Sequence, residues 1–201
     1  MGSPGLRERK KQKTRWAIQE HALRLFAEQG YEATTVEQIA AAAEVSPSTF
    51  FRYFPTKEDV VVQDEYDPML ISALESAPAE LAPVPAVRHA IHTAFAQLGP
   101  ADTAKVLERG RLSMSVPALR ARVVENLTGT IDVLAGPLAR RSGREPDDFA
   151  VRALAGACLG ALLAAVFAWL ESNGEQDLPG LIDEALAHLE SGFLTQDPRK
   201  A

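Results

Sequence analysis

Between Thr34 and Asp59 the chain gathers side chains that suit the binding of a nucleic acid. Hydroxyl groups and an arginine can hydrogen-bond phosphates and base edges, and aromatic rings can pack against them. The residues of this kind that lie on the outer surface of one short helix, or at its edges, are Pro47, Ser48, Thr49, Phe51, Arg52 and Tyr53. Aromatic rings beside an arginine make an unusual solvent face but a suitable DNA-binding one.

Three helix-start signals within 26 residues would position these side chains. Each joins a capping side chain to a residue that suits the first helical turn: Thr34 or Thr35 with Glu37 or Gln38, Ser46 with Pro47, and Thr56 with Asp59. Two short helices separated by a turn of about four residues form a helix-turn-helix. The pattern therefore predicts a recognition helix beginning near Ser46.

Apolar spacing agrees with this arrangement. Positions 3, 4 and 7 residues apart make one helical stripe of Val36, Ile39, Ala40 and Ala43. Val45 is expected to fill the turn, while Phe50 and Phe54, four residues apart, form the inward face of the second helix.

The stretch T-T-V-E-Q-I-A-x-x-A-E-V-S-x-S-T-F-F-R-Y-F-x-T-K-E-D resembles the DNA-binding signature of TetR-family transcriptional regulators. The resemblance is strong over residues 16–60. Two positions depart from the family pattern. Glu44 stands where a turn glycine is common, so a non-glycine residue is expected to adopt a positive φ at a cost of about 1 kcal/mol. Phe51 stands where many members have tyrosine, so a phosphate-contacting hydroxyl is missing.

The resemblance implies a site on double-stranded operator DNA. Thr35, Tyr53 and Lys57 would hold phosphates, assisted by the amide at the start of the third helix. The residues expected near base edges are Pro47, Ser48, Thr49 and Arg52. Ser46 and Phe51 complete the predicted DNA-binding set.

Charge is distributed unevenly along the 201 residues, whose net charge is −6. The basic residues cluster near the start, with Arg7, Arg9, Lys10, Lys11, Lys13 and Arg15 within nine positions. We expect residues 1–15 to form a flexible basic arm that contacts phosphates or the minor groove, the alternative being a solvated charge run. The acidic remainder is not expected to touch DNA. No signal peptide is indicated, which favours a cytoplasmic protein.

Helical periodicity continues to the end of the chain, and no strand-like alternation is seen. The predicted fold is all-α, with about nine helices. A three-helix headpiece over residues 16–60 would lead through a connecting helix, 56–76, into a ligand-binding and dimerisation body over 61–201. Pro137 is expected to kink the helix that begins near Val116.

Residues 153–170 contain no charge, but seven are alanine and two are glycine. A membrane span is disfavoured, because the stretch is only weakly hydrophobic for its length and no second span accompanies it. A helix apolar on all sides must be buried on all sides, and a small-residue ridge permits close helix approach. TetR-like proteins dimerise through a four-helix bundle, so the predicted homodimer contacts are Gly156, Ala157, Gly160, Ala164, Leu181, Ala185 and Leu189.

A small hydrophobic or amphipathic effector is expected to bind among the body helices. The predicted wall residues are Phe95, Leu98, Arg109, Leu112, Met114, Leu127, Ile131, Phe167 and Trp169. Arg109 and Arg111 hint at an anionic ligand, although solvated surface is the favoured alternative for both. The segment 109–122, R-G-R-L-S-M-S-V-P-A-L-R-A-R, resembles a group of actinobacterial TetR-like regulators in which acyl-CoA-type ligands occur.

Catalytic motifs are missing from the sequence, so an enzyme is not expected, and neither a cofactor nor a metal is predicted. His89 and His92 lie three residues apart without an evident third ligand, and Cys158 fits a small buried hydrophobe. The predicted function is a ligand-responsive dimeric repressor. The alternatives are an activator, an effector-independent DNA-binding protein and, more remotely, a helical protein-interaction module.

Overall fold

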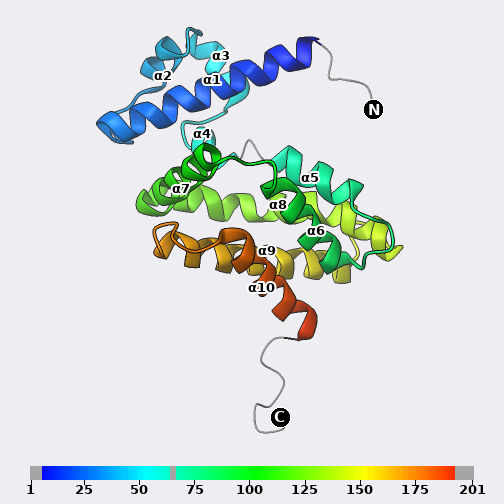
Figure 1. The fold of residues 1–201 in the computed structure, drawn as a ribbon. Helices are drawn as coiled ribbons and strands as arrows, with labels where there is room; N and C mark the ends of the chain where they lie inside the picture. Colours follow the sequence, from blue (N-terminus) through cyan, green and yellow to red (C-terminus); the bar gives the residue numbers. More distant parts are fainter. Residues whose placement is uncertain (1–5, 64–66, 193–201) are drawn as a thin grey trace. The chain divides into compact units, whose positions relative to one another are not determined.

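The computed structural model describes residues 6–63 and 67–192, and every regular element within them is a helix (Figure 1). This confirms the predicted all-α class. The helices of the described residues are α1 Leu6–Gln29, α2 Val36–Ala42, α3 Pro47–Tyr53, α4 Asp59–Val62, α5 Asp67–Ser76, α6 Pro83–Phe95, α7 Pro100–Ser115, α8 Pro117–Ser142, α9 Phe149–Glu171 and α10 Leu178–Ser191.

The predicted continuous connecting helix over residues 56–76 is wrong. Its first part is the short helix α4, which ends where Gln63 adopts an extended backbone with ψ of 113°. The second part is α5, which carries Pro68 in its first turn, where the missing N–H costs no helical hydrogen bond. This division raises the described helices to ten, one more than expected.

The described residues divide into two compact units. The headpiece unit takes its residues from 1–65 and 111–124, and the body unit takes its residues from 66–110 and 125–201. The buried apolar side chains of the headpiece are Ile18, Ala22, Phe26, Tyr31, Ile39, Ala40, Phe50, Phe54, Val60, Val61 and Leu119. Leu119 belongs to α8, so the headpiece includes a segment that the predicted boundary at residue 60 assigned to the body.

In the body unit, α10 packs against α9 and α6, and α5 packs against α6 (Figure 1). Prominent buried side chains of its core are Leu74, Val87, Ile91, Leu134, Leu138, Val151, Trp169, Ile182 and Leu186. Cys158 is buried among them, as its small-hydrophobe interpretation predicts. Burial raises the pKa of the Cys158 thiol to about 11, so the reactive thiolate is scarce at neutral pH.

Helix α9 is not buried on all sides within one chain. It packs on α10, but its small residues Ala153, Ala157, Gly160 and Ala164 are exposed. Among the described helices, α9 alone is long and apolar enough to cross a membrane, by length and composition. A helix of a soluble protein core passes the same criterion, and the exposed residues Ala157, Gly160 and Ala164 are among those predicted to meet another helix.

Candidate nucleic-acid interface

Two capped helices form the predicted helix-turn-helix. Thr35 and Gln38 make a reciprocal capping box at α2: the amide of Gln38 donates to Oγ1 of Thr35 at 3.3 Å, and the amide of Thr35 donates to Oε1 of Gln38 at 2.9 Å. Ser46 caps α3 by accepting a hydrogen bond from the amide of Thr49 at 3.1 Å. Pro47 occupies the first helical position, as predicted.

The turn between α2 and α3 is closed by backbone geometry. Glu44 adopts φ of 55°, which confirms the expected positive φ at this non-glycine position. The amide of Val45 then donates to the carbonyl of Ala40 at 2.9 Å, satisfying one of the carbonyls at the end of α2. This closure fixes the direction in which α3 leaves the turn.

Helix α3 presents one buried side and one exposed side. Phe50 and Phe54 are both buried in the headpiece core, with ring centroids 6.0 Å apart. Phe51 is 51 % exposed and meets the ring of Phe50 edge-on at 5.4 Å. The outer positions Pro47, Ser48 and Arg52 are also exposed, while Thr49 and Tyr53 are half-buried. The predicted recognition face is therefore assembled on one side of a helix anchored by two phenylalanines.

Hydroxyl groups meet at the start of this face. Oγ of Ser46 lies 2.9 Å from Oγ of Ser48 and 3.0 Å from Oγ1 of Thr49. At the other end of α3 the guanidinium of Arg52 lies 5.5 Å from the centroid of the Tyr53 ring. These contacts restrain polar groups that remain at the surface, which lowers the entropy cost of placing them against DNA.

The predicted flexible basic arm is wrong for residues 6–15, because α1 begins at Leu6; residues 1–5 lie outside the described part of the chain. Arg9, Lys10, Lys11 and Lys13 are exposed on this helix. Arg15 instead packs inward: its guanidinium donates to Oε1 of Gln63 at 2.8 Å and lies 5.2 Å from the centroid of the Phe54 ring. The basic residues thus belong to a helix, at fixed spacing.

Gln19 and Asp59 are buried polar residues of the headpiece; the sequence indicates Asp59 only as the capping partner of Thr56, and it does not indicate Gln19. The Gln19 side chain donates to the carbonyls of Val60 and Gln63 at 2.8 and 2.9 Å, and so satisfies the end of α4 from α1. Asp59 is buried and receives a hydrogen bond from Arg122 of α8 at 2.9 Å. Gln19 lies among the helical positions of the α1 core stripe, but no local signal links Arg122 to Asp59.

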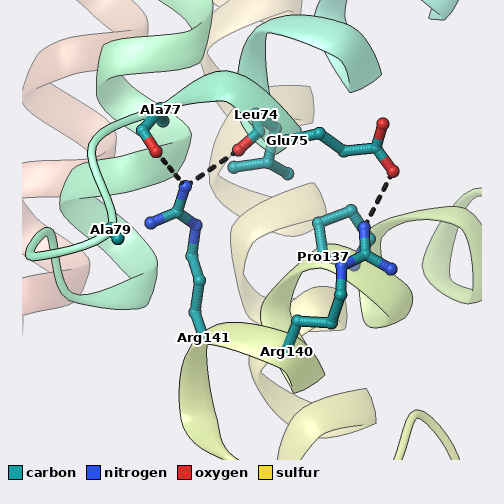
Figure 2. A pocket seen from close by; sticks show the side chains of 7 residues that line it. All are labelled: Leu74, Glu75, Ala77, Ala79, Pro137, Arg140 and Arg141. Carbon is teal, nitrogen blue, oxygen red and sulfur yellow. Dashed lines mark hydrogen bonds and ion pairs between the residues drawn. The ribbon is translucent and has the colours of Figure 1, made fainter.

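The described part of the body contains a cleft of about 280 Å³ between the end of α5 and the last turns of α8 (Figure 2). Figure 2 shows Arg141 reaching the carbonyls of Leu74 and Ala77, at 3.1 and 2.6 Å, which α5 leaves open at its C-terminus. Arg140 pairs with Glu75 at 2.8 Å. Because both arginines already have partners, we interpret the cleft as a gap between packed helices. None of the predicted effector-wall residues lines it.

The predicted effector-wall residues are distributed over both units. Trp169 lies in the body core, and Phe95, Leu127 and Ile131 are partly buried against that core. Phe167 is 41 % exposed, and Leu98 is half-buried. Leu112 packs on the headpiece core, and Met114 is half-buried in the headpiece segment 111–124. The predicted set is therefore not gathered in one unit.

The two arginines of α7 differ. Arg109 is 8 % exposed, so the solvated-surface interpretation is wrong for it, whereas Arg111 is exposed as that interpretation predicts. A buried guanidinium is rare in an apolar body unless it is paired, and Arg109 does have an interaction partner.

The predicted dimer residues lie on the outer side of α9 and α10. Ala157, Gly160 and Ala164 are exposed, and Gly156, Leu181, Ala185 and Leu189 are half-buried. A Cβ added at Gly160 would have open space around it, with no atom of this chain within 4 Å apart from its chain neighbours and the nearby backbone of its own helix.

His92 of α6 contacts α10, whereas His89 is exposed. His92 lies 3.1 Å from a carboxylate oxygen of Asp183, which also pairs with Arg88 at 2.8 Å. Hydrogen bonds from Arg88 and His92 outweigh desolvation and lower the pKa of Asp183 below its ordinary value. Within the described residues no three His, Cys, Asp or Glu side chains gather as a metal site.

A capped recognition helix on a three-helix scaffold defines a helix-turn-helix DNA-binding protein. Residues 18–63 match the description "Bacterial regulatory proteins, tetR family", and residues 81–194 match "MftR C-terminal domain". The chain therefore belongs to the TetR family of transcriptional regulators.

Relatives support this assignment over most of the chain. The HTH-type transcriptional regulator TcmR of Streptomyces glaucescens is 39 % identical over 152 residues, which cover 72 % of this chain and 67 % of TcmR. MftR of Mycobacterium tuberculosis, whose name assigns it to mycofactocin biosynthesis, is 30 % identical over 82 % of this chain and 84 % of MftR. Among solved structures, the Thermus thermophilus repressor FadR in complex with lauroyl-CoA aligns with a TM-score of 0.58 and 25 % identity, covering 91 % of this chain and 96 % of FadR.

Proposed function

We propose that the protein is a dimeric repressor that binds a palindromic operator and leaves it when a small amphipathic effector binds the body. The observation that carries this proposal is the exposed face of α3, held outward by the buried rings of Phe50 and Phe54. That face offers hydroxyls, an arginine and an aromatic ring, which is the chemistry of groove binding.

Specific roles follow from the placement of the side chains. Ser48 and Thr49 approach base edges at the start of α3, with Pro47 suited to a thymine methyl group. Arg52 reads guanine or holds a phosphate, and Tyr53 and Thr35 hold phosphates on either side. Phe51 lacks the hydroxyl of the tyrosine that many family members have at this position and presents an apolar ring edge instead. We therefore expect it to pack against a sugar or a thymine methyl group.

A second copy of the chain is the proposed occupant of the exposed side of α9. Alanine and glycine at Ala157, Gly160 and Ala164 allow a helix to approach closely, and the half-buried apolar residues of α10 widen the surface. Most soluble oligomers are two-fold symmetric, and such a dimer presents two recognition helices to half-sites about 34 Å apart. The operator is therefore expected to be palindromic, and the protein to work in the cytoplasm with its DNA.

We propose an acyl-CoA-type effector, because lauroyl-CoA is the ligand of a relative that matches nearly the whole chain. Arg109, buried in the body, gives the unit a cationic group that could attract the phosphates of a thioester-linked CoA headgroup. Only a ligand with unequal affinity for the DNA-bound and free conformations can change DNA occupancy.

DNA selection with the purified protein, followed by sequencing of the enriched pool at moderate salt, tests the DNA part of the proposal. A palindrome with half-sites one helical turn apart is the expected result. Enrichment of no sequence, with binding lost on a modest rise in salt, would leave only a non-specific electrostatic DNA binder.

Titration of the selected operator complex with lauroyl-CoA, laurate and free CoA tests the effector. Release by lauroyl-CoA alone supports a ligand that needs both chain and headgroup. Release by none of the three contradicts the acyl-CoA assignment while leaving DNA binding intact. Activation is the second candidate function, and transcription from a promoter with and without the protein separates it from repression.

A further inference from the structure

Lys57 lies just before α4 with its ammonium group turned toward the turn between α1 and α2. Nζ donates hydrogen bonds to the backbone carbonyls of Tyr31 at 3.0 Å and Thr34 at 3.1 Å. It also lies 4.1 Å from the centroid of the Tyr31 ring, within reach of a cation–π contact. Since an ammonium group has three N–H donors, two of the three already belong to this turn.

Tyr31 is itself held from several sides. Its ring is buried and lies 5.0 Å from the ring of Phe26, centroid to centroid. Its hydroxyl donates to a carboxylate oxygen of Glu58 at 2.7 Å. Burial and the bond to Glu58 raise the pKa of Tyr31, so the hydroxyl remains the donor at neutral pH. The neighbouring residues Lys57 and Glu58 therefore hold the backbone and the hydroxyl of the same tyrosine.

The turn held by Lys57 leads directly into the DNA-facing cap of α2. Thr34 is buried and its hydroxyl donates to the carbonyl of Gly30 at 2.8 Å. The Thr34 carbonyl that Lys57 binds belongs to the peptide that joins Thr34 to Thr35. Fixing that peptide fixes the exposed side chain of Thr35, which caps α2 and is expected to meet a phosphate.

We propose that Lys57 is a positioning residue for DNA binding: it holds the turn 30–35 so that Thr35 meets its phosphate, and it neutralises no phosphate itself. This role differs from the direct phosphate contact that the family resemblance implies for Lys57. The inference rests on the proposed operator binding. Failure of that function would already appear as failure of the wild-type protein to select a sequence.

Methylphosphonate scanning of the selected operator separates the two roles. Each substitution neutralises one phosphate, and the loss of affinity maps the phosphates that the protein contacts. The scan is made with the wild-type protein, Thr35→Ala, Lys57→Met and the double variant. We expect Lys57→Met to lower affinity about tenfold and to abolish sensitivity at the same phosphates as Thr35→Ala, with little further loss in the double variant.

Three results would overturn the proposal. One is that Lys57→Met abolishes sensitivity at phosphates distinct from those of Thr35→Ala, as a direct contact requires. Another is that Thr35→Ala remains as sensitive as the wild type to methylphosphonate substitution at every phosphate, because Lys57 would then have no phosphate contact to position. The third is a uniform loss at all positions, which marks a variant that is merely misfolded.

Amide hydrogen exchange gives a readout that needs no DNA. Lys57→Met is expected to speed exchange in residues 31–38 while leaving α3 unchanged, and unchanged exchange in that segment would contradict the proposal. Tyr31→Phe keeps the Lys57 charge but removes the hydroxyl that binds Glu58. It is expected to weaken DNA binding in the same direction, with the salt dependence of affinity unchanged.

Discussion

The carboxylate of Asp59 accepts a hydrogen bond from Nε of Arg122 at 2.9 Å, and this contact joins two segments of the headpiece that lie 63 residues apart in the chain. Asp59 is 1 % exposed, and its other oxygen accepts a hydrogen bond from the amide of Thr56 at 3.1 Å. The start of α4 is thereby tied to the first turns of α8, inside the headpiece unit.

Arg122→Met is expected to destabilise the headpiece by about 2 kcal/mol, because a buried carboxylate loses a charged hydrogen-bond donor. Chemical denaturation measures the change. Arg120→Met is the matched control, since Arg120 is exposed on the same helix, and it should change stability by no more than about 0.5 kcal/mol. Equal effects of the two variants would contradict the structural role of the ion pair.

Glu44 offers a test of stored backbone strain. Its φ of 55° is disfavoured for a residue with a Cβ, so Glu44→Gly is expected to be more stable than Glu44→Ala by about 1 kcal/mol. Comparison with the alanine variant removes any contribution of the carboxylate. Thermal or denaturant unfolding measures the difference, and a more stable alanine variant would show that the turn is not strained.

Local signals predicted the helix-turn-helix because its determinants lie a few residues apart. The capping box of Thr35, the Ser46–Pro47 helix start and the inward pair Phe50 and Phe54 all depend on spacings of one to four residues. Such spacings can be read directly from a chain. The positive φ at Glu44 is predicted on a different basis, because the family that the sequence resembles commonly has a glycine at this position of the turn.

Contacts between distant segments could not be predicted in this way. Leu119 and Arg122 fit an amphipathic body helix, and nothing in their neighbourhood indicates that they complete the headpiece. The bonds of Lys57 depend on where the turn at Tyr31 lies in space, since 26 residues separate them. The predicted effector wall and dimer contacts also depend on tertiary or partner packing, and they stay predictions.

Phe50 and Phe51 are neighbours with opposite expected roles. Phe50→Ala should cost about 3–5 kcal/mol, because the ring is fully buried and its loss leaves a cavity. Phe51→Ala should change stability by less than about 0.5 kcal/mol but weaken binding to the selected operator. Denaturation and binding titration of both variants measure these effects. A stable Phe51→Ala protein with unchanged affinity would remove Phe51 from the DNA-binding face.

The Glu58 carboxylate predicts an acid dependence of stability. Burial opposes its ionised form, but hydrogen bonds from Tyr31, its own backbone amide and Thr56, together with the charge of Lys57, outweigh this and lower the pKa of Glu58 below 4.5. A lowered folded-state pKa contributes stability above pH 4.5 that is lost as the pH falls below that value. Denaturation midpoints measured on either side of this value should therefore converge between the wild type and Glu58→Gln at the lower pH. A constant difference between them would contradict the linkage.

The exposed glycine of α9 allows the dimer to be tested without disturbing the protomer. Because Gly160 is exposed and a Cβ added there has open space around it, Gly160→Leu should leave the fold intact. In the proposed dimer the leucine would separate two closely packed helices, so sedimentation should report monomers and the operator affinity should fall. Gly129→Leu is the matched control, because Gly129 is a helical glycine of α8 with equally open space. If both variants remain dimers, the small-residue face of α9 is not the contact between copies. If both become monomers, the contact extends to the exposed side of α8.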